Sequence, residues 1–227
     1  MKSDKLIIVG DSAFAQIAYE YFTHDSNYEA VAFSVERQFL KRKELFGLPV
    51  VPFEELQELY DPKRHRIFVA ITYIGMNSVR TRLYKSAKEK GFTPVTYVSS
   101  KAFVWRNVEV GENCFVFENN VIQPFVRIGN NVIVWSGNHI GHHSIIHDNC
   151  FISSHVVISG FVEVGENCFL GVNSTISNNV RVAKDCLVGA GALVMKDTEE
   201  GAVYRAERTK RAEEDSRSYF KIGGPQG

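Results

Sequence analysis

The chain lacks the features that several classes of protein require. Its 227 residues include 26 Lys and Arg against 26 Asp and Glu, so the formal net charge is zero. This balance excludes the broad basic surface with which nucleic-acid-binding proteins follow phosphates. The apolar run near its start, residues 6–9, is far shorter than the ~20 residues of a membrane span, and no signal peptide is recognisable. The sequence therefore predicts a cytoplasmic protein without nucleic-acid or membrane partners.

Close cysteine pairs are also missing. The four cysteines are separated by 36, 18 and 18 residues, whereas zinc sites use short spacings such as C-x2-C. We therefore predict buried packing thiols in a reducing compartment and no metal. These residues are Cys114, Cys150, Cys168 and Cys186. Separations that are all multiples of eighteen indicate a repeat.

The repeat is clearest in the aliphatic residues, which return every six positions from Val104 to Val194 without an insertion. This period fits neither a helix nor an ordinary strand. Short strands joined by tight turns, three to a coil, would stack as a solenoid of slightly more than five coils. The position four residues after each aliphatic holds mostly slim side chains, including all four cysteines, as a crowded interior requires. Glycine often follows the aliphatic residue, where we expect it to help the backbone turn.

The first hundred residues follow a different pattern. Strands are expected at residues 5–9, 28–34, 66–71 and 93–98, and helices at residues 16–22, 53–60 and 78–90. Such alternation predicts a small parallel α/β sheet. The loop after the first strand begins with Gly10 but lacks the second and third glycines of the dinucleotide fingerprint, which argues against an NAD site. A phosphate or nucleotide site at the helix start and a simple connection both remain open.

An α/β domain followed by an unbroken hexad run resembles the bacterial nucleotide-amino-sugar N-acetyltransferases. These belong to the hexapeptide-repeat (left-handed β-helix) acyltransferase superfamily, and the segment VGENCFLGVNSTI at residues 164–176 is very close to this branch. The resemblance implies a Rossmann-like nucleotide-sugar-binding domain at residues 1–98. It also implies a left-handed parallel β-helix of about five coils at residues 99–197. Residues 198–227 are mixed in charge and lack hexad order, which indicates a C-terminal cap or tail whose last five residues we expect to be mobile.

The same resemblance implies a homotrimer with active sites between neighbouring subunits, acetyl-CoA as the donor and a nucleotide-linked amino sugar as the acceptor. The sequence departs from the family at two places. Residues 13–15 replace a loop that is richer in glycine in relatives, and residues 204–210 replace the usual C-terminal ending. The nucleotide and the contacts to the adenine end of CoA therefore stay open.

Five of the seven histidines fall within seventeen residues: His139, His142, His143, His147 and His155. A neutral imidazole can accept the proton that an amine must lose when it attacks a thioester. His142 matches the family's catalytic histidine by register, with His139 and His155 as alternatives. His143 stands where relatives carry an acidic residue, so the partner that orients the base is open: it is a carboxylate from elsewhere in the chain or a backbone carbonyl. A surface or subunit-interface role is the plain alternative for the cluster.

The candidate site has three groups of residues. The catalytic group is His142, His143 and Asn138. The acceptor-binding group is Gly10, Ser12, Ala13, Phe14, Asn77 and His139. The CoA-binding group is Ser159, Gly160, Asn173, Gly189 and Ala190. Glycines and asparagines at solenoid turns also have structural reasons to exist, and Phe14 and Asn77 could equally be packing residues.

The sequence thus predicts an acyltransferase that transfers an acetyl group directly from acetyl-CoA to a nucleotide-linked amino sugar, with a histidine general base, for polysaccharide biosynthesis. O-acetylation of a sugar and a non-catalytic trimeric scaffold are the alternatives. Five clustered histidines argue against a bare scaffold, because packing alone does not require them. The identity of the nucleotide (UDP, dTDP or GDP) is not specified by these residues.

Overall fold

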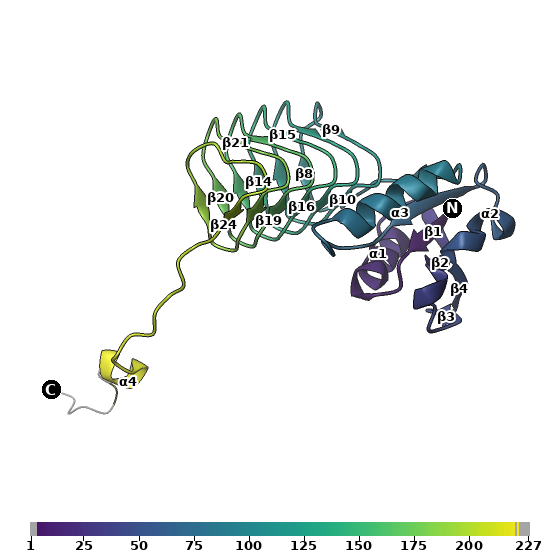
Figure 1. Ribbon diagram of the computed structural model, residues 1–227, viewed down its shortest axis with the longest axis horizontal. Coiled ribbons are helices and arrows are strands. Elements are labelled where there is room, and N and C mark those ends of the chain that lie inside the picture. The colour runs from purple at the N-terminus through teal and green to yellow at the C-terminus, as the bar shows by residue number, and fades with distance from the viewer. Residues whose placement is uncertain (1–3, 221, 223–227) are drawn as a thin grey trace.

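The computed structural model describes residues 4–220 and 222 of the chain. An α/β domain packs against one side of a three-walled solenoid, and a C-terminal segment leads away from the solenoid's far end (Figure 1). The last five residues, for which mobility was expected, lie outside the described part. Within the described residues, no helix combines the length and the apolar character that crossing a membrane requires.

The α/β domain contains a six-stranded sheet in the order β3-β4-β2-β1-β5-β6. Its strands are β1 (Asp4–Val9), β2 (Tyr28–Val35), β3 (Glu44–Leu45), β4 (Leu48–Pro52), β5 (His65–Val69) and β6 (Thr93–Pro94). The helices are α1 (Ala13–His24), α2 (Leu56–Leu59) and α3 (Ser78–Glu89), with short 3-10 helices at Arg37–Phe39 and Phe53–Glu55. All neighbouring strands are parallel except the β3–β4 pair, as the strand–helix alternation predicts.

The two faces of this sheet pack on different partners. Side chains alternate along β1, so Leu6 and Ile8 join a core with α1, whereas Ile7 and Val9 join one with α3. The first of these cores also contains residues of the solenoid, including Phe115 and Ile133. One face of the sheet is therefore sealed by α1 and the solenoid together, and this fixes the position of the α/β domain.

The expected strand at residues 93–98 is shared between the two domains. Val95 N donates to Ile67 O and so continues the α/β sheet, whereas Tyr97 N donates to Cys114 O in the solenoid. A short run of strand-forming residues cannot reveal that its two halves pair with different sheets. The first strand of the solenoid is consequently β7 (Tyr97–Val98).

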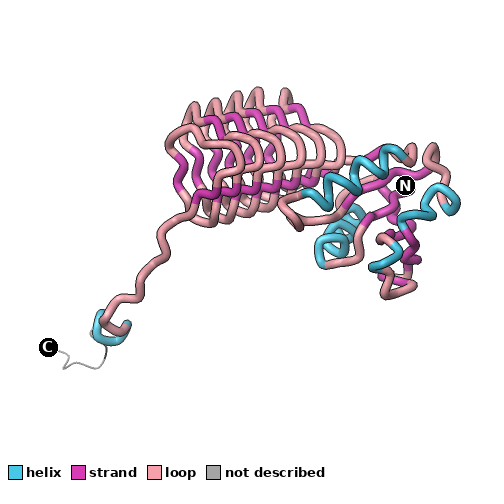
Figure 2. The backbone as a smooth tube through the Cα atoms, viewed as in Figure 1, coloured by secondary structure: helices cyan, strands magenta, loops and turns pink. Residues whose placement is uncertain are grey.

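Three parallel sheets form the walls of the solenoid, and the strands line up along each wall (Figure 2). The first wall contains β7, β10 (Phe115–Val116), β13 (Ile133–Val134), β16 (Phe151–Ile152), β19 (Phe169–Leu170), β22 (Leu187–Val188) and β24 (Val203–Tyr204). The second wall contains β8 (Phe103–Val104), β11 (Val121–Ile122), β14 (His139–Ile140), β17 (Val157–Ile158), β20 (Thr175–Ile176) and β23 (Leu193–Val194). The third wall contains β9 (Glu109–Val110), β12 (Arg127–Ile128), β15 (Ile145–Ile146), β18 (Glu163–Val164) and β21 (Arg181–Val182).

The interior of the solenoid follows the six-residue pattern. Its core consists of the repeated aliphatic residues and the slim residues four positions later. The four cysteines are buried and unpaired, as predicted, and each thiol donates to a backbone carbonyl of the next coil, for example Cys150 Sγ to Gly165 O at 3.1 Å. Burial raises the pKa of Cys114 to about 12, which keeps this thiol protonated and inert.

The expectation that the glycines after the aliphatic residues help the backbone to turn is wrong. The left-handed backbone lies two positions later, at residues such as Asn131 (φ 56°) and Asn167 (φ 59°). The glycines are instead required by close stacking, because a Cβ on Gly141 would lie 2.6 Å from Gly160 N in the next coil. The turn and the missing side chain thus sit at different positions of the hexad.

A single strand extends the solenoid beyond the last hexad. β24 pairs with β22 in the first wall, although residues 199–204 show no hexad order. The chain then runs outward through exposed residues to the short helix α4 (Ser216–Tyr219). Within the predicted cap or tail, residues 198–204 therefore form a part-coil, and residues 205–220 form an arm that leads away from the solenoid.

One buried arginine joins the two domains. Arg80 on α3 is fully buried, and its guanidinium donates to Asn149 O and Cys150 O, both at 3.0 Å, and to Asn131 O at 3.2 Å. It also donates to Thr72 O in its own domain at 2.9 Å. Burial lowers the pKa of Arg80 to about 10, so the side chain stays charged at neutral pH.

Candidate functional site

The three edges of the solenoid are not equivalent. The α/β domain covers the first wall, where Phe115 and Phe151 are buried. The edge between the second and third walls lies opposite that covered wall, because each coil passes through the walls in the order first, second, third. His142 and His143 lie on this edge, which we call the histidine edge, and both are exposed.

His142 is held between neighbouring coils. Its backbone N donates to Gln123 Oε1 at 2.9 Å in the preceding coil. In the following coil its ring lies against Gly160, where an added Cβ would come within 2.8 Å of His142 Cε1 and 2.9 Å of Nε2. Gly160 has an ordinary φ, so the absence of a side chain there serves to make room for the imidazole. The predicted base and one predicted CoA-site residue are therefore in contact.

His143 contacts the same imidazole from the side. The Nδ1 atoms of His142 and His143 lie 3.1 Å apart, at hydrogen-bond distance. The His143 ring is stacked between Phe125 and Phe161, with ring centroids at 4.6 and 4.8 Å. Neither a carboxylate nor a backbone carbonyl, the two partners considered from the sequence, makes this contact with His142 in the described structure.

The backbone amides near His142 are already hydrogen-bonded. Gly141 N donates to Ile158 O, and Gly160 N donates to Asn178 Oδ1 at 2.9 Å. Either amide could stabilise an oxyanion in acyl transfer only if its present hydrogen bond is exchanged. Asn178 is an exposed side chain, so its bond to Gly160 is the one that can open.

Two other residues predicted near the base lie apart from it. The Asn138 side chain is buried within the coil, where Oδ1 accepts from Val156 N at 2.7 Å and Nδ2 donates to Trp135 O. Its polar atoms are used by the backbone, which favours the structural alternative. His139 points outward from β14 on the second wall and is half-buried.

The remaining CoA-site candidates are divided between two edges. Ser159 adjoins Gly160 at the histidine edge, whereas Asn173, Gly189 and Ala190 lie at the edge between the first and second walls. This second edge also carries His155, whose ring lies where a Cβ of Gly137 would be, at 2.6 Å from Cε1. A single chain therefore does not bring all of the predicted CoA-site residues together.

The loop predicted to bind the nucleotide stands at the start of α1. Ser12 occupies the N-cap position and is exposed, and its side chain makes no capping hydrogen bond. Ala13, the first residue of the helix, is also exposed. Gly10 has φ 121° and abuts Ala70 O, so only glycine fits there. Phe14 is 3% exposed and packs on Phe115 and Trp135, which leaves no face of its ring on which a nucleobase could stack.

Asn77 also belongs to the domain interface. It is fully buried, accepts from Arg80 at 3.2 Å, and donates at 3.4 Å to the carbonyl oxygens of Asn167 and Cys168. These contacts favour the packing alternative that the sequence left open for this residue. Of the acceptor-binding candidates in the α/β domain, Ser12 and Ala13 are exposed at the helix start, whereas Gly10 is buried beneath them.

A polar column borders α1 at the edge between the first and second walls. Tyr21 OH donates to Glu118 Oε2 at 2.7 Å, and Ser136 Oγ donates to Glu118 Oε1 at 2.6 Å. Burial and the bond to Glu118 raise the pKa of Tyr21 to about 12. Although burial raises the pKa of Glu118, these hydrogen bonds hold it below its ordinary value, so the carboxylate remains ionised. This edge therefore presents a fixed negative charge beside the helix.

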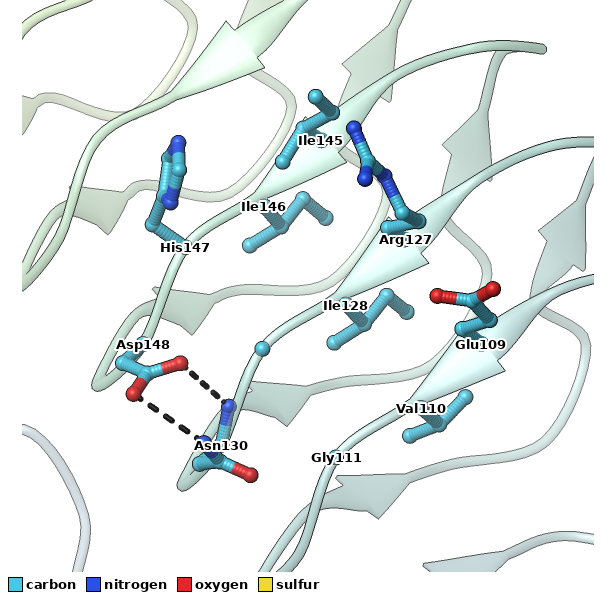
Figure 3. Close-up of a pocket in the computed structure, with 11 residues that line it drawn as sticks. Glu109, Val110, Gly111, Arg127, Ile128, Asn130, Ile145, Ile146, His147 and Asp148 are labelled. Carbon is cyan, nitrogen blue, oxygen red and sulfur yellow. Dashed lines mark hydrogen bonds between the residues drawn. The ribbon is translucent and has the colours of Figure 1, made fainter.

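A groove of about 500 Å³ runs along the third wall (Figure 3). Glu109, Arg127 and His147 point into it, and Asp148 accepts from Asn130 N at 2.7 Å. None of the predicted site residues lines this groove. Within the described residues, no cluster of three or more His, Cys, Asp or Glu side chains could hold a metal ion.

The aromatic neighbours of the histidine edge were missed from the sequence. Phe125 and Phe161 lie eighteen residues before and after His143, so the coil length alone places them above and below it. Gln123 and Asn178 were also missed, because their role depends on hydrogen bonds to backbone amides. Register identifies which side chains stack, but it does not reveal such bonds.

Comparison with known families and structures agrees with this architecture. Residues 107–142 and 125–160 match the pattern described as "Bacterial transferase hexapeptide (six repeats)". Residues 161–196 match the "Hexapeptide repeat of succinyl-transferase". No curated protein matches the chain by sequence.

Several solved structures share both domains. One is a histidine-to-asparagine mutant of perosamine N-acetyltransferase from Caulobacter crescentus, in complex with CoA and GDP-perosamine. It is 24% identical to this chain with a TM-score of 0.79, and the match covers 89% of this chain and 97% of that structure. The acetyltransferase domain of PglB from Neisseria gonorrhoeae FA1090, in complex with acetyl coenzyme A, is 23% identical with a TM-score of 0.80 and covers 88% and 95%. WeeI from Acinetobacter baumannii AYE is 19% identical with a TM-score of 0.69 and covers 88% and 98%.

Likeness at these identities shows the shared fold, and the repeat matches identify residues 107–196 as hexapeptide repeats. The resemblance to sugar acetyltransferases and the predicted order of an α/β domain before a hexapeptide β-helix are both confirmed. The matched repeat is a transferase repeat, in agreement with the predicted acyltransferase class. Residues 107–196 therefore carry hexapeptide repeats of the bacterial transferase type.

Proposed function

We propose that the protein transfers the acetyl group of acetyl-CoA to the amine of a nucleotide-linked amino sugar, with His142 as general base. The observation that carries this proposal is the contact between His142 and Gly160, which leaves His142 Nε2 at an exposed edge with no hydrogen-bond partner from the described chain. The CoA and GDP-perosamine complexes of the Caulobacter enzyme support the choice of donor and acceptor class.

The step requires one proton transfer at His142. As the amine nitrogen forms a bond to the thioester carbonyl carbon, His142 Nε2 takes its proton, and the carbon–sulfur bond then breaks with return of that proton to the CoA thiolate. Gly160 N, beside the His142 ring, would donate to the negative charge that develops on the carbonyl oxygen, once Asn178 releases it. The amine attacks in its neutral form, after its ammonium has released one proton to solvent, and the base accepts the second proton that the nitrogen must lose as the amide forms.

The geometry favours an active site shared between copies of the chain. The loop at Gly10–Ala13 lies over the first wall, whereas His142 lies on the opposite edge of the same solenoid. The second wall between these regions exposes apolar side chains, with Phe103 at 52% and Leu193 at 62%. We infer that this wall is covered by a neighbouring copy in a homotrimer, so that the loop of one copy meets His142 of the next.

The helix start of α1 would bind a phosphate of the acceptor, because its free amides and the exposed Ser12 form an anion-binding end of a 12-residue helix. The nucleotide would then supply most of the acceptor's affinity. We also propose a cytoplasmic location, since four buried free thiols fit a reducing compartment.

The proposal is tested by measuring CoA thiol release with UDP-, dTDP- and GDP-linked amino sugars, with the matching hydroxyl sugars and with free amino sugars. Wild-type protein is expected to release thiol only with a nucleotide-linked amine, and His142→Asn is expected to lower kcat by about 10²- to 10⁴-fold and to remove the acid limb of the pH profile. His139→Asn and His155→Asn are the matched controls. A His142→Asn protein with more than a third of wild-type kcat and an intact acid limb would reassign the base, and acetylation of hydroxyls alone would change the acceptor class.

A further inference from the structure

The edge that carries His142 has an unusual column of side chains. The left-handed corner positions of the solenoid are asparagine in seven cases, whereas three consecutive coils at this edge carry Phe125, His143 and Phe161, with φ of 66°, 60° and 58°. Asparagine and histidine tolerate this backbone region, but phenylalanine adopts it at an energetic cost. The corner alone therefore does not explain three aromatic residues in a row.

The stack has a definite geometric effect on His143. Its ring lies 26° from the plane of Phe125 and 17° from that of Phe161, so it is confined between two nearly parallel faces. The His142 ring is almost perpendicular to it, at 87°, and the two Nδ1 atoms are 3.1 Å apart. The stack therefore aims one nitrogen of His143 at one nitrogen of His142.

We propose that His143 is a positioning residue that holds His142 in the tautomer required of a base. This inference rests on the proposed function of His142. His143 carries its proton on Nε2, so the lone pair on its Nδ1 accepts from His142 Nδ1–H. His142 Nε2 then keeps its own lone pair, next to Gly160. With the opposite arrangement His142 would carry its proton on Nε2 and could not accept another.

A neutral imidazole as the hydrogen-bond acceptor of His142 affects the strength of this base differently from a carboxylate. When His142 takes a proton, its positive charge faces an uncharged imidazole, so the base is weaker than it would be beside an anion. The charged groups that border His143 are Glu109 and Arg127, which line the same hollow of about 290 Å³ and have opposite signs. Neither makes an ion pair with His142 or His143 among the described residues.

Two substitutions separate positioning from packing. His143→Phe keeps an aromatic ring in the stack but removes the acceptor, and we expect kcat to fall by roughly 10²-fold because His142 loses its orientation. His143→Asp removes the ring but restores an acceptor, and we expect it to retain more activity than His143→Phe and to move the acid limb up by about one pH unit or more. His147→Phe, at a histidine of the third wall, is the matched control and is expected to keep wild-type kcat.

A spectroscopic measurement tests the pairing without relying on turnover. Long-range ¹H–¹⁵N correlation of the intact protein, with assignment by His142→Asn, should show His142 protonated at Nδ1 in the wild type and redistributed between its tautomers in His143→Phe. The proposal is overturned if His142 is protonated at Nε2 in the wild type, or if His143→Phe keeps both the tautomer and the activity while His143→Asp loses them. Absence of acetyl transfer in the wild type would contradict the proposed function and would leave the tautomer result to decide the pairing.

Discussion

The imidazole of His142 lies directly over Gly160, eighteen residues and one coil further along the solenoid. A methyl group on Gly160 would come within 2.8 Å of His142 Cε1 and 2.9 Å of Nε2, and the three nearest atoms to that position all belong to this ring. The absence of a side chain at Gly160 thus determines the position of the His142 ring, the proposed base.

Gly160→Ala should therefore displace His142 while the fold survives. The obstacle is a side chain at an exposed edge, which can move, and Gly160 has no left-handed φ that alanine would strain. A shift of the base by about 1 Å costs roughly 10²-fold in kcat. We expect this loss with little change in the melting temperature and in KM for acetyl-CoA, measured by thiol release and thermal unfolding.

Gly141→Ala is the matched control for that variant. Its Cβ would meet backbone, at 2.5 Å from Ser159 C and 2.6 Å from Gly160 N, so the coils themselves must separate. We expect a loss of about 1 to 3 kcal/mol in the free energy of unfolding. If Gly160→Ala unfolds as readily as Gly141→Ala, or keeps full activity, the contact with His142 does not position the base.

The solenoid could be predicted from the sequence because its period is encoded in every coil. A wrong register would turn the aliphatic residues of all sixteen hexads outward, so the pattern from Val104 to Val194 admits one solution. The same register placed His142 and Gly160 in contact. The domain interface has no such period. Phe14 and Asn77 are buried by residues far away in sequence, and their local sequence is equally compatible with a ligand-binding loop.

Copies of the chain that are inactive for different reasons should restore activity when mixed. His142→Asn removes the proposed base, and Ser12→Glu places a negative charge at the helix start where an acceptor phosphate would bind. If each site uses the loop of one copy and His142 of the next, random mixed trimers contain both intact halves in about a quarter of their sites. We expect co-expressed and co-purified variants to recover about that fraction of wild-type kcat. Mixed assemblies that stay as inactive as either parent would show that the two halves belong to the same chain.

Arg80 should hold the two domains together. Arg80→Met keeps the length of the side chain but removes the donor to the carbonyls of Asn131 and Asn149, whereas Cys150 O keeps its bond from Ile133 N. We expect the free energy of unfolding to fall by about 2 to 3 kcal/mol, and proteolysis near residues 95–100 to become faster.

Arg82→Met is the matched control on the same helix, because Arg82 is exposed and pairs with Glu36 at the surface. That change is expected to cost less than about 1 kcal/mol. Equal effects of both substitutions would contradict an anchoring role for Arg80.

Asp25 should make the attachment of α1 to the solenoid sensitive to acid. Tyr97 OH donates to Asp25 Oδ2 at 2.5 Å and Ser100 N donates to it at 2.9 Å, and these bonds, that of Tyr97 above all, hold the pKa of Asp25 below its ordinary value. The pKa of Asp25 is lower in the folded protein than in the unfolded protein. The stabilisation that ionised Asp25 gives to the folded state is therefore fully present above the ordinary pKa of about 4, and it is lost as the pH falls through the pKa of the folded state. Asp25→Asn should therefore lower the free energy of unfolding by roughly 1 kcal/mol at pH 7, and the stabilities of the two proteins should become equal in acid.

Urea unfolding between pH 7 and pH 2 measures this difference, with Asp4→Asn at the exposed start of β1 as the control for removing one charge. A difference that stays constant down to pH 2 would show that the ionised form of Asp25 contributes nothing.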